Sequence, residues 1–149
     1  MDSFEQDEKE CARIEEENEK LLDDFGEWLE EKGIAPKTID RHLFNVELYI
    51  NEFLLNSEAM DAAEGIDEIG EFLGYWFIKK AMWANKSQIK KNATSLKKFY
   101  QFMLEKGKIS QESYKELEET IKEEMQEWLD TMDRYDDPDI EDMEEVWGI

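Results

Sequence analysis

The sequence lacks most of the residues that carry catalysis: among 149 residues it has one histidine, one cysteine and three arginines. The single histidine, His42, has no second histidine with which to share a metal ion or a proton relay, so we expect a packing or helix-surface residue. Cys11 has no partner for an intrachain disulfide, and its acidic neighbours should raise its pKa. No glycine-rich phosphate loop is present, and the acidic run 136–142 lacks the central glycine and the spacing of a calcium loop. We therefore expect no enzyme activity, no cofactor and no bound metal.

Long apolar runs are also missing, and no stretch approaches the roughly 20 residues of a membrane-spanning helix. The first ten residues, MDSFEQDEKE, have neither the basic start nor the apolar centre of a secretory signal. Only two prolines and seven glycines interrupt the chain, while 40% of its residues are hydrophobic. These features favour an all-α protein with a sizeable core, a cytoplasmic location and no membrane partner.

Apolar residues recur at helical spacing in five segments, namely 18–32, 36–55, 66–82, 87–106 and 110–135. Gly33 and Gly107 are placed to end the first and fourth helices, and Pro36 to begin the second. Ser87 and Ser110 are the expected N-caps of the fourth and fifth helices. Residues 1–20 should form an acidic N-terminal extension, either a solvated helix or disordered, and residues 110–149 an acidic C-terminal helix and tail.

Several aromatic positions are expected to be buried. Phe44 and Leu48 lie opposite the main apolar stripe of the second helix and suggest a helix that is buried on two faces. Phe102 lies off the stripe of its own helix and should pack on the fifth helix. Five further aromatics of the central segment are expected to be core residues rather than base-stacking groups: Trp76, Phe77, Trp83, Phe99 and Tyr100.

Charge is distributed unevenly, although the net charge of −22 argues on average against a nucleic-acid partner. Residues 1–72 carry 6 basic and 23 acidic side chains, and residues 105–149 carry 5 basic and 17 acidic ones. Residues 73–104 carry 7 lysines and no acidic residue. The central segment is therefore a cationic island in an anionic chain.

The fourth helix gathers much of this positive charge on one face. At 100° per residue, one continuous stripe opposite the apolar stripe contains Ser87, Lys90, Lys91, Thr94, Lys97, Lys98 and Gln101. Lys79, Lys80 and Lys86 can extend this patch from the end of the preceding helix. Lys37 and Arg41, one turn apart on the outer face of the second helix, can join it. Such a surface can neutralise and hydrogen-bond phosphates.

Two ordinary explanations compete with a phosphate-binding face. Lysines on a helix are often simply solvated, and the acidic fifth helix can lie across them and pair with them. The complete absence of aspartate and glutamate from residues 73–104 is what favours a functional face.

Residues 21–109 resemble the N-terminal SAM-like, or core-binding, domain of tyrosine recombinases and phage integrases. The segment LLDDFGEWL at 21–29 is similar to the family's opening helix, and GIAPKTIDRHL at 33–43 to the start of its second helix. The segment KSQIKKNATSLKKFYQFML at 86–104 resembles its last helix. The resemblance implies a four-helix bundle that contacts duplex DNA with its second and fourth helices, here followed by an additional acidic C-terminal helix.

The catalytic half of that family has no counterpart in the sequence, because the chain contains no His-x-x-Arg motif. We therefore expect a non-catalytic DNA-binding domain of integrase type, as in DNA recombination and integration, which contacts the backbone of double-stranded DNA. Its expected contacts are Lys37, Arg41, Lys86, Ser87, Lys90, Lys91, Thr94, Lys97 and Lys98. The alternative is an acidic protein-interaction module that binds a partner, or a second copy of itself, through residues 110–149.

Overall fold

The computed structural model describes residues 1–149 except 1–2, 57 and 137–149. Within the described part there is no β-strand, so the predicted all-α class is confirmed. The elements are α1 (Ser3–Glu31), α2 (Pro36–Glu47), η1 (Leu48–Phe53), η2 (Glu64–Glu68), α3 (Ile69–Glu71), η3 (Phe72–Trp76), α4 (Phe77–Lys80), α5 (Lys86–Glu105) and α6 (Gln111–Asp136). Of the three η segments, η1 and η3 are π-helical and η2 is a 3-10 helix. The expected acidic tail lies outside the described residues.

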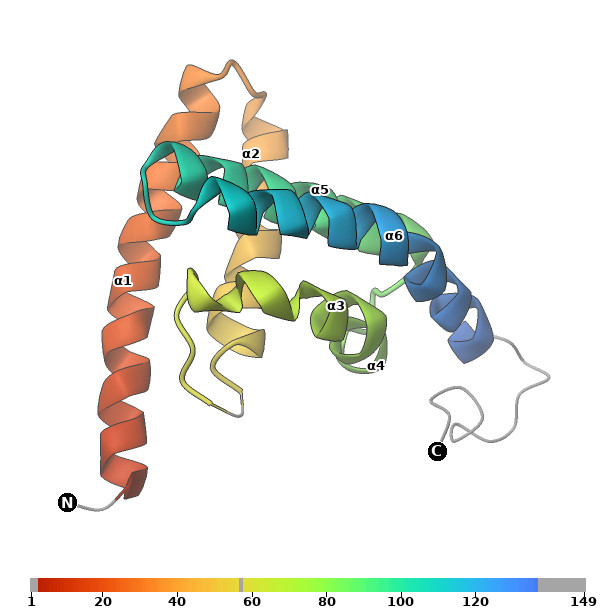
Figure 1. Ribbon diagram of the computed structural model, residues 1–149, viewed down its shortest axis with the longest axis horizontal. Coiled ribbons are helices and arrows are strands. Elements are labelled where there is room, and N and C mark those ends of the chain that lie inside the picture. Colours follow the sequence, from red (N-terminus) through yellow and green to blue (C-terminus); the bar gives the residue numbers. More distant parts are fainter. Residues whose placement is uncertain (1–2, 57, 137–149) are drawn as a thin grey trace.

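Helix α5 contacts helices on several sides (Figure 1). It packs along α6, on α2 and, near its carboxyl end, on α1. The short segments η2, α3 and η3 pack against α6, and η3 also contacts α4, α5 and η1. In Figure 1 α5 and α6 run side by side, while the red amino-terminal half of α1 extends away from them.

Helix ends follow the predicted local signals at most positions. Gly33 and Gly107 have φ of 79° and 72°, the left-handed conformation that suits glycine just after a helix. Pro36 lies in the first turn of α2, and the Ser110 hydroxyl accepts a hydrogen bond from the Ser113 N–H at 3.0 Å. Each of these four signals depends only on residues close in the sequence. The sequence alone was therefore enough to predict these helix ends.

The predicted N-cap of α5 is wrong. The side chain of Asn85, not Ser87, caps the helix by accepting a hydrogen bond from the Gln88 N–H at 2.8 Å. Asn85 has extended backbone angles, φ −157° and ψ 174°, whereas Ser87 already lies inside the first helical turn. The amide oxygen of asparagine caps a helix at least as well as a serine hydroxyl. The helix therefore begins at Lys86, directly after Asn85.

Residues 3–20 continue α1 without a break at the expected boundary. Ile14 and Asn18 are each only 1% exposed. The Asn18 amide donates hydrogen bonds to the Ile50 carbonyl oxygen at 3.2 Å and to Asn51 Oδ1 at 2.8 Å. The second half of the extension is therefore docked on η1, as a helix with a specific polar contact.

The expected third helix, 66–82, is a series of short segments that ends at Lys80. Two glycines, Gly70 and Gly74, weaken its preference for a regular α-helix. A Cβ atom added at Gly74 would lie 2.8 Å from Cδ1 of Trp128, which shows how closely α6 approaches this backbone. Packing by large aromatic side chains thus overrides the simple helical period.

Aromatic side chains hold α1 to α5. The ring of Phe25 lies 5.4 Å from Phe99 and 5.6 Å from Phe102, and Trp28 lies 6.0 Å from Phe102, measured between ring centroids. Phe102 is fully buried in this cluster, so the expectation that it packs on the fifth helix is wrong. The apolar period of one helix identifies the residues that lie off its main stripe. It does not identify the helix against which those residues pack.

Two other expectations of burial are also wrong. Phe44 is 54% exposed and Trp83 is 45% exposed. Phe44 projects directly away from the core face of α2, and Trp83 lies in the turn before α5. Trp76, Phe77, Phe99 and Tyr100 do pack in or against the core as expected.

The Gly74–Trp128 contact gives a test of how α6 is docked. Gly74→Ala should lower the free energy of unfolding by about 1–3 kcal/mol, because the new methyl group overpacks against the indole ring. Gly70→Ala is the matched control, since its Cβ would lie 3.6 Å from the nearest atom, at an ordinary contact distance. The control should be neutral or stabilising by about 0.4–1 kcal/mol. Urea denaturation measures both, and equal effects at the two glycines would contradict this packing.

Candidate nucleic-acid interface

The buried face of α5 determines where its lysines lie. Its fully buried side chains include Ile89, Leu96, Phe99 and Tyr100. The hydroxyl of Tyr100 also donates a hydrogen bond to the Ala62 carbonyl oxygen at 2.7 Å, which fixes the rotation of the helix. The opposite face carries the predicted stripe, in which Ser87, Lys90, Lys91, Thr94 and Lys97 are exposed and Lys98 is half-buried.

Along the α6 edge of the stripe, two predicted cations are paired with carboxylates. Lys97 Nζ lies 3.5 Å from Glu118, and Lys86 Nζ lies 3.0 Å from Asp133. Both pairs are about half exposed to solvent, so each is worth only about 0–1 kcal/mol. The competing explanation of charge matching with the fifth helix therefore holds for this edge.

The remaining cations of the predicted site are not paired with carboxylates. Lys37 and Arg41 of α2 and Lys90, Lys91 and Lys98 of α5 have no carboxylate within 4.0 Å in the part of the chain that the structure describes. We refer to these five residues as the α2–α5 cationic face. It is narrower than the predicted site, because Lys86 and Lys97 belong to the paired edge.

A buried polar cluster joins the two helices of this face. His42 Nδ1 lies 2.7 Å from the Ser95 hydroxyl oxygen, and the Asn45 amide donates a hydrogen bond to the same oxygen at 3.0 Å. All three side chains are buried, with His42 7% exposed. The cluster fixes the register of α2 against α5 and agrees with the expectation that His42 is a packing residue.

One cation from each of the two helices acts on the His42 imidazole. Burial lowers the pKa of His42 from its ordinary value of 6.5, and the positive charges of Arg41 and Lys98 lower it further. Arg41 belongs to α2 and Lys98 to α5, so the two halves of the cationic face act on one imidazole. This shared effect on His42 supports the prediction that Arg41 belongs with the lysines of α5. It does not extend to Lys37.

The two hydroxyl residues of the predicted site are placed differently. The Thr94 hydroxyl donates a hydrogen bond to the Lys90 carbonyl oxygen at 3.0 Å. Its proton is therefore engaged within the helix and is not offered to a phosphate. Ser87 is exposed and has no capping role, which leaves its hydroxyl available.

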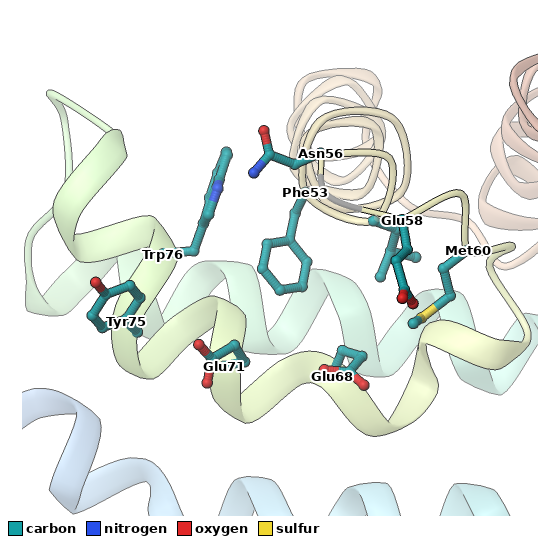
Figure 2. Close-up of a pocket in the computed structure, with 9 residues that line it drawn as sticks. Phe53, Asn56, Glu58, Met60, Glu68, Glu71, Tyr75 and Trp76 are labelled. Atoms are coloured by element: carbon teal, nitrogen blue, oxygen red, sulfur yellow. The ribbon is translucent and has the colours of Figure 1, made fainter. Parts of the chain in front are cut away.

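The structure also has a cavity of about 350 Å³ between η1 and the segment from η2 to η3 (Figure 2). Phe53 and Trp76 form its aromatic wall, and Glu58, Glu68 and Glu71 are the charged residues that line it (Figure 2). These carboxylates would repel a phosphate, so the cavity is not part of the cationic face.

Other candidate chemistry is sparse in the described ranges. No group of three or more histidine, cysteine, aspartate and glutamate side chains there is arranged to hold a metal ion. Burial, followed by the negative charges of Glu15, Asp7 and Glu10, raises the pKa of the Cys11 thiol. The expected direction of that pKa shift is confirmed, although the largest cause is burial rather than charge.

Comparison with known proteins finds no protein-family model, no curated protein and no solved structure that matches this chain. None of the described helices combines the length and the apolar character needed to cross a membrane.

The lowered pKa of His42 predicts a pH dependence of stability. The unfolded chain protonates His42 below about pH 6.5, whereas the folded chain resists protonation. This contribution is complete above pH 6.5 and is lost as the pH falls through the lowered pKa of the folded state. His42→Asn keeps a polar group near the Nδ1 position but cannot titrate. Between pH 7.5 and 5.5 the free energy of unfolding should fall more in the natural chain than in this variant; parallel curves would contradict the assignment.

Proposed function

We propose that the chain is a non-catalytic DNA-binding domain that contacts the backbone of duplex DNA through the α2–α5 cationic face. The observation that carries the proposal is that five cations of two helices that pack together, α2 and α5, have no carboxylate within 4.0 Å in the described part of the chain. The resemblance of residues 21–109 to the core-binding domain of integrases supports the same two helices. We assign no base readout to this face, since lysines that contact phosphates position a protein without specifying a sequence.

The dimensions of the face suit a duplex. From Lys90 to Lys98 the helix rises about 12 Å, at 1.5 Å per residue. A duplex carries one charge per 1.7 Å of its axis, so this length spans about seven phosphates. Five unpaired cations are enough to neutralise most of the phosphates on the near side.

The net charge of −22 opposes binding at long range, but its effect is limited by salt. At physiological ionic strength the screening length is about 8 Å, so distant carboxylates of α1 and the outer face of α6 contribute little. Glu118 and Asp133 lie much closer to the face, because they contact Lys97 and Lys86. Helix α6 therefore tunes the affinity from one edge without covering the face.

The alternative function, a protein-interaction module, receives no comparable support from α6. Its apolar stripe is used inside the chain, where Leu117, Trp128, Leu129 and Met132 are buried. No large hydrophobic side chain of α6 is exposed within the described residues. The rest of the partner surface that this alternative requires, residues 137–149, lies outside them.

Removing the unpaired lysines tests the proposal. Lys90→Gln, Lys91→Gln and Lys98→Gln combined should make the slope of log affinity against log salt shallower by about 3 for a short duplex. Affinity at 50 mM salt should fall about tenfold or more, and reversal of the three charges to glutamate should abolish binding. The matched control is Lys20→Gln, Lys106→Gln and Lys108→Gln, which makes the same charge change at exposed lysines off the face. Fluorescence anisotropy measures both; equal losses in the two triple variants would refute a localised interface.

Releasing the paired lysines tests the influence of α6. Glu118→Gln with Asp133→Asn frees Lys97 and Lys86 and should strengthen duplex binding, with a salt slope steeper by up to about 2. The control is Glu116→Gln with Glu123→Gln, which changes the net charge equally at exposed carboxylates that are not in these pairs. Deleting α6 is unsuitable, because it would remove Trp128 from the core. If the two double variants gain the same affinity, the effect is only one of net charge.

A further inference from the structure

Two aromatic rings are exposed at the junction of α2 and the turn before α5. The rings of Phe44 and Trp83 contact each other with centroids 6.0 Å apart and an angle of 57° between their planes. They are 54% and 45% exposed, and Met82 beside them is 99% exposed. The rings therefore form one contiguous exposed aromatic pair rather than two isolated surface residues.

The pair is held in place from beneath. The ring of Trp83 packs edge-on against Phe77, with 6.4 Å between their centroids, and Phe77 is fully buried. Phe44 lies in α2, between His42 and Asn45. The hydrogen bonds of these two residues to Ser95 fix the rotation of α2 about its axis. Two rings anchored in this way lose little conformational entropy when a ligand covers them.

The surroundings of the pair are cationic on the side that faces α5. Phe44 follows Arg41 by one helical turn, so both project from the outer surface of α2. Trp83 lies within the 32-residue segment 73–104, which contains seven lysines and no carboxylate. Asp40 and Glu47 border Phe44 on the opposite side, away from α5, as helical geometry requires. A ligand that covers both rings and continues toward α5 must therefore be aromatic or apolar in one part and anionic in the next.

We propose that Phe44 and Trp83 stack on an unpaired base of DNA whose neighbouring phosphates lie on the α2–α5 cationic face. The inference rests on the proposed function, since the lysines supply the backbone contacts. An intact duplex cannot offer the face of a base, because its bases are stacked on one another. The chain therefore prefers single-stranded or gapped DNA to an uninterrupted duplex, by about 5- to 150-fold for one stacked base.

A protein partner fits these features less well. The rings occupy a small area compared with the roughly 800 Å² per partner of a stable protein interface. A second copy of this chain would bring its own cationic face and a net charge of the same sign. Bases combine a flat apolar surface with regularly spaced negative charge, which is the combination that the rings and lysines match.

The test compares a 12-nucleotide oligo(dT) with a 12-base-pair duplex by fluorescence anisotropy at 50 mM salt, using the full chain. The natural chain should bind oligo(dT) more tightly. Trp83→Ala and Phe44→Ser should each weaken that binding about fivefold or more while leaving duplex affinity nearly unchanged, and Trp83→Phe should retain most of it. Tyr75→Ala is the control, since Tyr75 is also an exposed aromatic residue but lines the acidic cavity. Circular dichroism confirms that each variant is folded.

The outcomes separate the inference from the proposed function. Duplex binding together with oligo(dT) binding that Trp83→Ala and Phe44→Ser leave unchanged would overturn the stacking inference alone. Absence of binding to either DNA would overturn both. Sedimentation equilibrium adds a further outcome: a dimer that dissociates in Trp83→Ala, without any preference for oligo(dT), would assign the rings to self-association and overturn the inference.

Discussion

The packing of α5 through one aromatic face is the interaction on which the rest of the structure depends. Phe99 and Phe102 of α5 contact Phe25 and Trp28 of α1, and the Tyr100 hydroxyl reaches the Ala62 carbonyl oxygen. A helix held at so many points has one rotation about its axis. Because its apolar residues must be buried, its lysines must face outward, and the position of the cationic face follows from the core rather than from any attraction among like charges.

The fold places paired and unpaired lysines at different positions around α5. The net charge of −22 does not reveal this arrangement. Helix α6 brings Glu118 and Asp133 to one edge of the lysine stripe, while the His42, Asn45 and Ser95 cluster brings Arg41 to the other. The polar cluster avoids a cost that a charged group would incur, since a protonated imidazole there would be buried beside Arg41 and Lys98. The positive charge is reduced along the α6 edge and remains unpaired elsewhere. The proposed interface is therefore formed by α2 and α5.

Local signals predicted much of this fold from the sequence, and non-local packing accounts for the errors. Gly33, Gly107, Pro36 and Ser110 act through the nearest residues, and each was placed correctly. Phe102 and Trp83 were misplaced because burial depends on which helix arrives from elsewhere in the chain. For Phe44 a signal was present, since Lys37 and Arg41 project from the same surface of α2 and indicate an exposed side. The lysine stripe was predictable from helical period, whereas its division into paired and unpaired halves required the position of α6.

The most direct test is an NMR titration of the ¹⁵N-labelled full chain with a short DNA duplex at low salt. If duplex DNA binds the α2–α5 cationic face, the chemical-shift changes are concentrated on α2 and α5, around Arg41, Lys90, Lys91 and Lys98, and they decline as salt is added. Changes concentrated on α1, on α6 or around the acidic cavity, or no changes at all, would contradict the proposed function.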